Sequence, residues 1–339
     1  VLDRHLVPRL LAGGVGTGAG VGPALAAVKG HQMAKSALEL AVLDAELRAR
    51  GVSLARHLAG ASGSGGDPAG RVAAGVAVGI AGTVDALVAE VGRWVAQHYR
   101  RVKLKIRPGW DVGPAAAVRA AWPDLLVGVD ANGSYGPGVA ARAPAGPGAP
   151  AAPEGLAAPA RLEALEALDA LDHLGLSMIE QPLGDDDLVG HAALARRLRT
   201  PVCLDEPITS AAVAEAALEL GAASVINVKA ARVGGYLEAV RVHDVCRARG
   251  VPVWCGGMVE TGIGRAANLA LASLPSFTIP GDLSGSDRWW AADIVTPELG
   301  VEADGTIAVP RGPGIGVEVR AGAVDAAATW RRWYRAAAK

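Results

Sequence analysis

A regular alternation of short apolar runs and longer helical stretches begins near Val72, and this feature most restricts the fold. Each run has the length of a buried strand, and the stretches between them carry apolar residues at helical spacing. Such alternation predicts an α/β protein with a parallel sheet covered by helices, and eight runs predict a closed (β/α) barrel. The candidate strands are residues 72–80, 102–106, 125–130, 176–180, 201–206, 224–229, 251–257 and 276–282.

The segments that flank this alternation have a different character. Residues 1–70 contain "HQMAKSALELAVLDAELRAR", which predicts a small, mainly helical domain with no preceding strand. We expect the barrel to span residues 71–283 and residues 284–339 to return to the N-terminal domain. The Asp304-Gly305 pair in the last segment predicts a hairpin turn.

Two stretches are poor in core-forming residues. Residues 136–160 are rich in Pro, Gly and Ala, which predicts a low-complexity insertion between a strand and its helix. The glycine cluster "GGVGTGAGVG" at residues 13–22 lacks the preceding strand of a dinucleotide-binding motif, so we interpret it as a flexible loop.

Composition excludes several classes of function. The chain has 339 residues, of which 51% are hydrophobic, enough for a large core. Its 33 basic and 34 acidic residues are mixed, so a nucleic-acid partner is not expected, and no apolar run is long enough to span a membrane. Three scattered cysteines indicate a reducing compartment rather than a disulfide framework, and we expect a cytoplasmic protein.

The second candidate strand, "VKLKI", carries two lysines in an apolar run. Side chains alternate along a strand, so Lys103 and Lys105 share one face, which in a barrel is the interior. An edge strand with a solvated lysine face is the alternative.

Charged residues also end the next four candidate strands, which favours the barrel interpretation. They are Asp130, Glu180, the pair Asp205 and Glu206, and Lys229. Barrel active sites are built at the carboxyl ends of strands, so these side chains are expected to converge there. Three carboxylates from adjacent strands suit Mg²⁺, although each acid could instead cap a helix.

The lysines complement such a site. An ammonium near a cation and a second ammonium loses proton affinity, so Lys105 could act as a general base near neutral pH. Because strands two and six lie on opposite sides of the mouth, Lys105 and Lys229 would flank a substrate. That arrangement suits removal of a proton alpha to a carboxylate.

Six motifs in order resemble the enolase superfamily, within it the muconate-lactonising subgroup and the o-succinylbenzoate synthase / N-succinylamino acid racemase family. They are "VKLKIRPGWDV", "VDANGSY", "IEQPL", "CLDEPI", "NVKAARVGGYLEA" and "WCGGMVETGIGRAANLALA". The resemblance implies a modified (β/α)7β barrel with an α+β capping domain, whose first strands this sequence would lack. It also implies a small-molecule carboxylate substrate and a homo-oligomer.

The resemblance assigns roles to particular residues. Lys105 and Lys229 would be the two catalytic lysines, and Mg²⁺, or Mn²⁺ in its place, would be held by Asp130, Glu180 and Asp205.

Other residues would surround these groups. Lys103 would hold the substrate carboxylate and lower the pKa of Lys105, and Asn132 would contact the substrate or support the ligands. Glu206 would lie behind the ligands, Gly257 and Met258 would form a substrate wall, and the Arg232 context is typical of members that racemise.

The implied reaction is dehydration of 2-succinyl-6-hydroxy-2,4-cyclohexadiene-1-carboxylate through an enolate, a step of menaquinone biosynthesis. Racemisation of N-succinylamino acids by two-base proton transfer would use the same residues, so the motifs leave both activities open. A Schiff-base lysine aldolase and a non-catalytic scaffold are more distant alternatives.

Overall fold

A computed structural model of the chain describes residues 1–63, 66–136 and 158–335. The predicted low-complexity insertion therefore lies almost entirely outside the described residues. The helix that follows it, α7, begins at Ala158.

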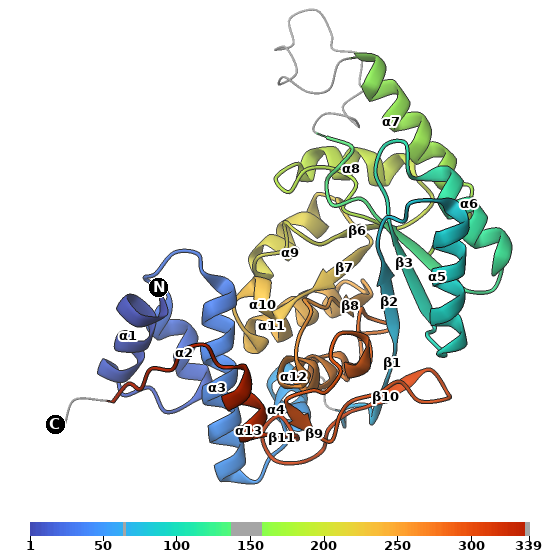
Figure 1. The fold of residues 1–339 in the computed structure, drawn as a ribbon. Coiled ribbons are helices and arrows are strands. Elements are labelled where there is room, and N and C mark those ends of the chain that lie inside the picture. Colours follow the sequence, from blue (N-terminus) through green and yellow to red (C-terminus); the bar gives the residue numbers. More distant parts are fainter. Residues whose placement is uncertain (64–65, 137–157, 336–339) are drawn as a thin grey trace, which may run out of the picture.

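The centre of the molecule is a curled sheet of seven parallel strands (Figure 1). The strands lie in chain order, each hydrogen-bonded to the next, and helices follow them along the chain. This arrangement confirms the predicted (β/α) architecture. The strands are β2 (Gly75–Val78), β3 (Arg101–Lys105), β4 (Leu126–Asp130), β5 (Ile179–Glu180), β6 (Val202–Leu204), β7 (Val225–Val228) and β8 (Val253–Cys255).

Two of the predicted strands differ from the observed ones. The first, residues 72–80, is divided at Ala74 into β1 (Arg71–Ala73) and β2, and β1 leaves the barrel to pair with a distant strand. The eighth, residues 276–282, forms only single bridges, from Phe277 to Val253 and from Gly281 to Ala74. Pro280 has no N–H to donate, which accounts for the interrupted ladder along this segment.

Helices cover the outside of the sheet and bury the main hydrophobic core against it. Several begin at a residue whose side chain accepts a backbone N–H, as Thr83, Asp187 and Ser210 do. The helices are α5 (Val84–Ala96), α6 (Val112–Ala121), α7 (Ala158–Leu171), α8 (Leu188–Arg197), α9 (Ala211–Glu219), α10 (Ala230–Val233), α11 (Tyr236–Ala248) and α12 (Gly262–Ala272).

The N-terminal part is helical, as its pattern predicts, and has a small core of its own around Leu6, Leu10, Val21 and Leu25. The expected loop at residues 13–22 is wrong, because α2 begins within it. A Cβ at Gly18 would lie 2.2 Å from the side chain of Leu43, so glycine permits the close approach of two helices. The elements are η1 (Leu2–Leu6), α1 (Val7–Ala12), α2 (Gly18–Leu25), α3 (Gln32–Arg50) and α4 (Leu54–Ser62).

The C-terminal segment runs back across the N-terminal helices. Gly305 adopts a left-handed turn with a φ of 74°, as the Asp-Gly pair predicts. The strand after the turn pairs with β1 rather than completing a regular local hairpin. Further on, the N–H of Ile315 donates to Asp44 at 2.8 Å. The remaining elements are η2 (Ser286–Arg288), β9 (Val295–Thr296), β10 (Thr306–Ala308), β11 (Glu318–Val319), which pairs with β9, and α13 (Ala321–Ala327).

Among the helices described, none combines the length and the apolar character needed to cross a bilayer.

Candidate active site

The predicted functional residues meet at the carboxyl edge of the sheet. Lys105 and Asp130 are register partners in β3 and β4, and Asp130 is the partner of Glu180 in β5. Asp205 follows β6 directly, and Lys229 follows β7 at the start of α10. Parallel strands in register therefore bring these side chains to one end of the barrel.

Lys103 lies deepest in this group. Its residue is only 2% exposed, and its Nζ lies 3.0 Å from Asp130, 2.7 Å from Glu180 and 2.8 Å from Asp282. Burial opposes the charge of Lys103, but the three carboxylates outweigh it and hold its pKa well above the usual value. The alternative of a solvated lysine face is therefore wrong for this strand.

Lys105 lies closer to the opening, with its side chain 34% exposed. Its Nζ donates to Asp130 at 2.7 Å and to the amide oxygen of Asn132 at 2.5 Å. Asn132 in turn donates to Glu206 at 2.8 Å. Asn132 and Glu206 thus form a chain of contacts behind the ammonium group.

Lys229 and Arg232 share one carboxylate. Lys229 Nζ lies 2.8 Å from Oδ2 of Asp205, and the guanidinium of Arg232 contacts Oδ1 of the same residue. Their common partner is nearly inaccessible to solvent, because Asp205 is 1% exposed. Arg232 therefore competes with Lys229 for the negative charge of Asp205.

Glu180 is fully buried between like charges. Its Oε1 accepts from Asn227 at 2.8 Å, whereas its Oε2 faces Lys103 without a hydrogen bond of good geometry. Burial, and then the carboxylates of Asp130, Asp205 and Asp282, raise the pKa of Glu180 despite Lys103. An additional cation beside these acids would relieve that repulsion.

Within the described residues, no three His, Cys, Asp or Glu side chains converge into an arrangement that could hold a metal ion directly. The carboxylates of Asp130 and Asp205 are instead engaged by cationic side chains. Their chemistry still suits a hard divalent cation, because they are oxygen donors from neighbouring strands with an unsatisfied oxygen at Glu180.

A cavity of about 280 Å³ opens at this edge and is lined by all three lysines. Gly257 lies on its wall, where a Cβ would come within 2.4 Å of the carbonyl oxygen of Asp282. Met258 lines an adjoining cavity of about 230 Å³, together with Lys229 and Met33 of α3. The structure thus places the two predicted wall residues beside Lys229.

Four residues of this cluster are not among those predicted from the sequence. Asp282 contacts Lys103 and also Arg101, whose guanidinium lies 2.5 Å from it. The ring of Trp254 lies beneath Lys103, with 4.6 Å between Nζ and the ring centroid, and Asn227 supports Glu180. Asp282 could have been found, because it ends the eighth predicted run just as the other acids end theirs.

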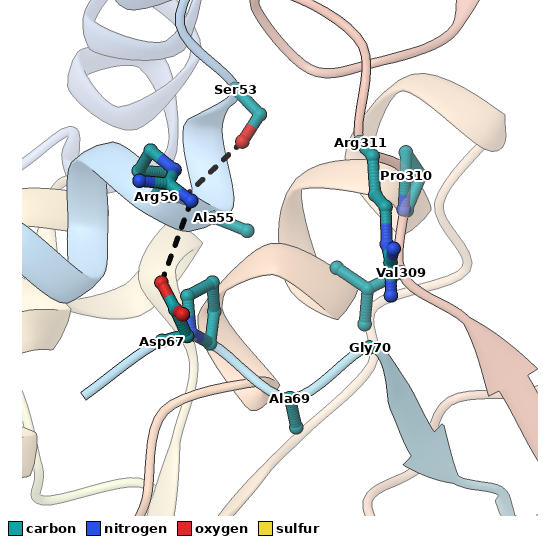
Figure 2. Close-up of a pocket in the computed structure, with 10 residues that line it drawn as sticks. Ser53, Ala55, Arg56, Asp67, Ala69, Gly70, Val309, Pro310 and Arg311 are labelled. Atoms are coloured by element: carbon teal, nitrogen blue, oxygen red, sulfur yellow. Dashed lines mark hydrogen bonds and ion pairs between the residues drawn. The ribbon is translucent and has the colours of Figure 1, made fainter.

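A second pocket, of about 290 Å³, lies elsewhere, between α4 and the segment after β10 (Figure 2). The backbone N–H of Arg56 donates to Ser53 at 3.4 Å, and its guanidinium lies 3.5 Å from Asp67. None of the residues at the strand ends lines this pocket. The chemistry described above therefore belongs to the barrel edge.

Comparison with known proteins agrees with this geometry. The family model described as "Enolase C-terminal domain-like" matches residues 86–323. The chain belongs to the enolase superfamily. The predicted resemblance is thereby confirmed, and the chain is an enzyme of a superfamily that acts on small molecules.

Curated relatives in the superfamily carry two names. An N-succinylamino acid racemase from Amycolatopsis sp is 49% identical over 334 residues, covering 98% of this chain and 82% of the relative. An o-succinylbenzoate synthase from Geobacillus kaustophilus is 43% identical over 319 residues, covering 94% and 76%.

Solved structures support the superfamily fold. A superfamily member from Enterococcus faecalis V583 has a TM-score of 0.81 at 38% identity, with 96% of this chain and 79% of that chain covered. The muconate lactonizing enzyme of Pseudomonas putida, at 24% identity and a TM-score of 0.79, is similar in fold alone, over 96% and 83% of the two chains.

Proposed function

We propose that this enzyme is an o-succinylbenzoate synthase that dehydrates 2-succinyl-6-hydroxy-2,4-cyclohexadiene-1-carboxylate. The observation that carries the proposal is that Lys105 and Lys229 line one cavity while each is held by a different buried carboxylate. Two lysine side chains that reach one substrate from different strands, one as a neutral amine and one as an ammonium group, suit removal of a proton alpha to a carboxylate. Relatives with this name are 38–43% identical to the chain.

Asp130, Glu180 and Asp205 would hold Mg²⁺, with Mn²⁺ as a substitute. Their oxygen chemistry, the unsatisfied oxygen of Glu180 and the mutual repulsion of the buried acids support this assignment. When bound, the cation would stabilise the negative charge that develops on the substrate carboxylate.

Lys105 and Lys229 would then have different roles in the reaction. Neutral Lys105 removes the alpha proton, and protonated Lys229 stabilises the enolate from the other side. The carbon–oxygen bond then breaks as the new double bond forms, and the proton on Lys105 leaves with the hydroxide as water. Lys103 would help to orient the carboxylate, and Gly257 and Met258 would wall the succinyl part.

Racemisation of N-succinylamino acids is the second candidate, and two observations favour it. Arg232 contacts the same carboxylate as Lys229, so it would influence how readily Lys229 exchanges a proton. The racemase from Amycolatopsis sp is 49% identical to this chain. In this reaction both lysines would exchange protons with one carbon.

The test is to incubate the pure protein with Mg²⁺ in D₂O, separately with the cyclohexadiene substrate and with each enantiomer of N-succinylphenylglycine. The synthase proposal expects ultraviolet-detected aromatic product, and the racemase proposal expects deuterium at the alpha carbon with inversion. Lys105→Ala and Lys229→Ala should each lower turnover by about a hundredfold or more. Lys29→Ala, an exposed lysine in the N-terminal part, is the matched control.

If neither substrate reacts with the wild-type protein, the proposed substrate class is refuted. If the two lysine variants remain as active as the Lys29→Ala control, the proposed mechanism is refuted.

A further inference from the structure

A buried carboxylate of the N-terminal part meets the barrel close to the active site. Glu39, on α3, is 5% exposed, and its Oε1 accepts the backbone N–H of Leu237 at 3.0 Å. It also forms a backbone hydrogen bond at Tyr236, the first residue of α11. The residue that precedes α11, Gly235, has no side chain to cap the helix. Glu39 therefore caps α11 from a segment 198 residues away in sequence.

The contact requires the glycine pair between α10 and α11. A Cβ at Gly235 would lie 2.3 Å from Oε2 of Glu39, and a Cβ at Gly234 would lie 3.2 Å from the side chain of Gln32. Glycine at these positions thus lets α3 approach the backbone. In Figure 1, α3 lies beside the short helix α10, against which it packs.

A short stretch of chain with local backbone hydrogen bonds links this contact to Lys229. The carbonyl oxygen of Lys229 accepts the N–H of Arg232 at 2.9 Å, and that of Ala230 accepts the N–H groups of Gly234 and Gly235 at 3.1 and 3.0 Å. Helix α11 begins at the next residue. Residues 229–237 are therefore one short unit, with the Asp205-binding side chains at one end and the Glu39 contact at the other.

We propose that Glu39 is a positioning residue, which fixes the 229–237 unit against α3 and so sets where Lys229 and Arg232 stand relative to the substrate. This inference rests on the proposed function only in that it takes Lys229 to exchange a proton with the substrate. The N-terminal part would then affect the chemistry of Lys229 but not that of Lys105. Lys105 lies on β3, and Glu39 does not connect it to residues 229–237.

The surroundings of Glu39 indicate that backbone hydrogen bonds, rather than an ion pair, hold its side chain in place. Burial raises its pKa to about 7, opposed by the two backbone hydrogen bonds and by Arg241, while Glu238 adds repulsion. Glu39 itself lines a cavity of about 350 Å³, together with Gln32 and Lys35 of the same helix. Lys35 donates to the carbonyl oxygen of Val28 and not to Glu39. Glu39 instead accepts its hydrogen bonds from backbone N–H groups.

The first experiment compares Glu39→Ala with Glu46→Gln, a control on the same helix whose carboxylate also accepts a backbone N–H, that of Gly18. Alpha-proton exchange in D₂O is measured for each enantiomer of an N-succinylamino acid. Because each lysine serves one face, Glu39→Ala should slow exchange with one enantiomer about tenfold more than with the other. Glu39→Gln, whose amide oxygen can still accept an N–H, should restore most of the loss. Equal slowing of both enantiomers would refute the positioning role.

The second experiment needs no substrate. Hydrogen exchange measured by mass spectrometry should show faster exchange at Tyr236 and Leu237 in Glu39→Ala but not in Glu46→Gln. Gly235→Ala should have the same effect, because its methyl group would lie 2.3 Å from Oε2 of Glu39 and the carboxylate would have to move.

The two experiments distinguish a failure of this inference from a failure of the proposed function. Unchanged exchange at Tyr236 and Leu237 refutes the inference. If that exchange changes while no substrate reacts with the wild-type protein, the contact is real and the proposed function has failed.

Discussion

Asp282 contacts two cationic side chains of β3 that point into the barrel. It lies 2.5 Å from Arg101 and 2.8 Å from Lys103, and both partners are almost fully buried. Burial raises the pKa of Asp282, but Lys103 and then Arg101 outweigh burial and hold it well below the usual value. At the scale of single residues, the site therefore depends on balanced buried charges.

Removing the negative charge of Asp282 from this cluster should destabilise the folded protein. Asp282→Asn leaves Arg101 and Lys103 buried with less compensating charge, so the free energy of unfolding should fall by about 3 kcal/mol. Urea denaturation followed by circular dichroism measures this. Asp304→Asn is the matched control, since Asp304 is half exposed and pairs with Arg71 at the surface. Equal small losses in both variants would mean that the buried cluster does not stabilise the fold.

Glu39 should make stability depend on pH in a defined window. Its pKa is raised from 4.5 to about 7 by burial, so the folded state binds a proton that the unfolded state releases in this range. Stability contributed by the protonated form is therefore lost as pH rises from 4.5 to 7, by at most about 3.5 kcal/mol, at about 1.4 kcal/mol per pKa unit.

Glu39→Gln lacks this titration. Its free energy of unfolding relative to wild type should therefore rise between pH 5 and pH 8 in denaturant titrations. A constant difference between the two proteins across this range would contradict the assignment.

At the scale of elements, the closing of the barrel depends on backbone contacts that no side-chain pattern encodes. The segment before Asp282 passes so close to β2 that a Cβ at Gly75 would lie 2.4 Å from the carbonyl oxygen of Gly281. Sequence periodicity predicted a strand here, and the structure has only isolated bridges. The apolar run and Pro280 were visible in the sequence, whereas the two bridges that remain, to Ala74 beside β2 and to Val253 of β8, depend on how this segment packs.

Gly75→Ala should therefore destabilise the protein by about 1–3 kcal/mol, because the methyl group must displace backbone. Gly79→Ala is the matched control near the end of the same strand, where a Cβ would meet nothing within 4 Å. Its effect should stay within about 0.5 kcal/mol. Thermal unfolding of both variants compares them, and a Gly75→Ala protein as stable as Gly79→Ala would show that the closing segment can shift freely.

At the scale of the whole molecule, the proposed Mg²⁺ would join the acids that end three strands and would lie between the lysines of two others. Added Mg²⁺ at a hundred times its dissociation constant should raise the free energy of unfolding by about 2.7 kcal/mol. Thermal shift measures this effect, and Asp205→Asn should abolish it whereas Asp304→Asn should not.

Removal of the metal is the complementary measurement. EDTA should abolish turnover, and Mg²⁺ should restore it. Activity that survives EDTA, together with a borohydride-trapped lysine adduct, would instead support the Schiff-base aldolase.

The sequence by itself determined the alternation of strands and helices, and with it the edge at which Lys105, Asp130, Glu180, Asp205 and Lys229 had to meet. Parallel strands carry their carboxyl ends to one side, so the position of a residue in its run is enough to place it there. The paired positions of Lys103 and Lys105 followed from the two-residue period of a strand in the same way.

Only the tertiary structure decided which charges touch. Arg101 and Asp282 lie 181 residues apart in sequence, and Glu39 lies 198 residues from the helix that it caps. Such contacts depend on how whole elements pack, and local pattern carries no information about partners so distant in the chain. Helix α2, which lies where a glycine-rich loop was expected, also depends on a distant contact. Glycine is favourable at position 18 only once Leu43 packs against it.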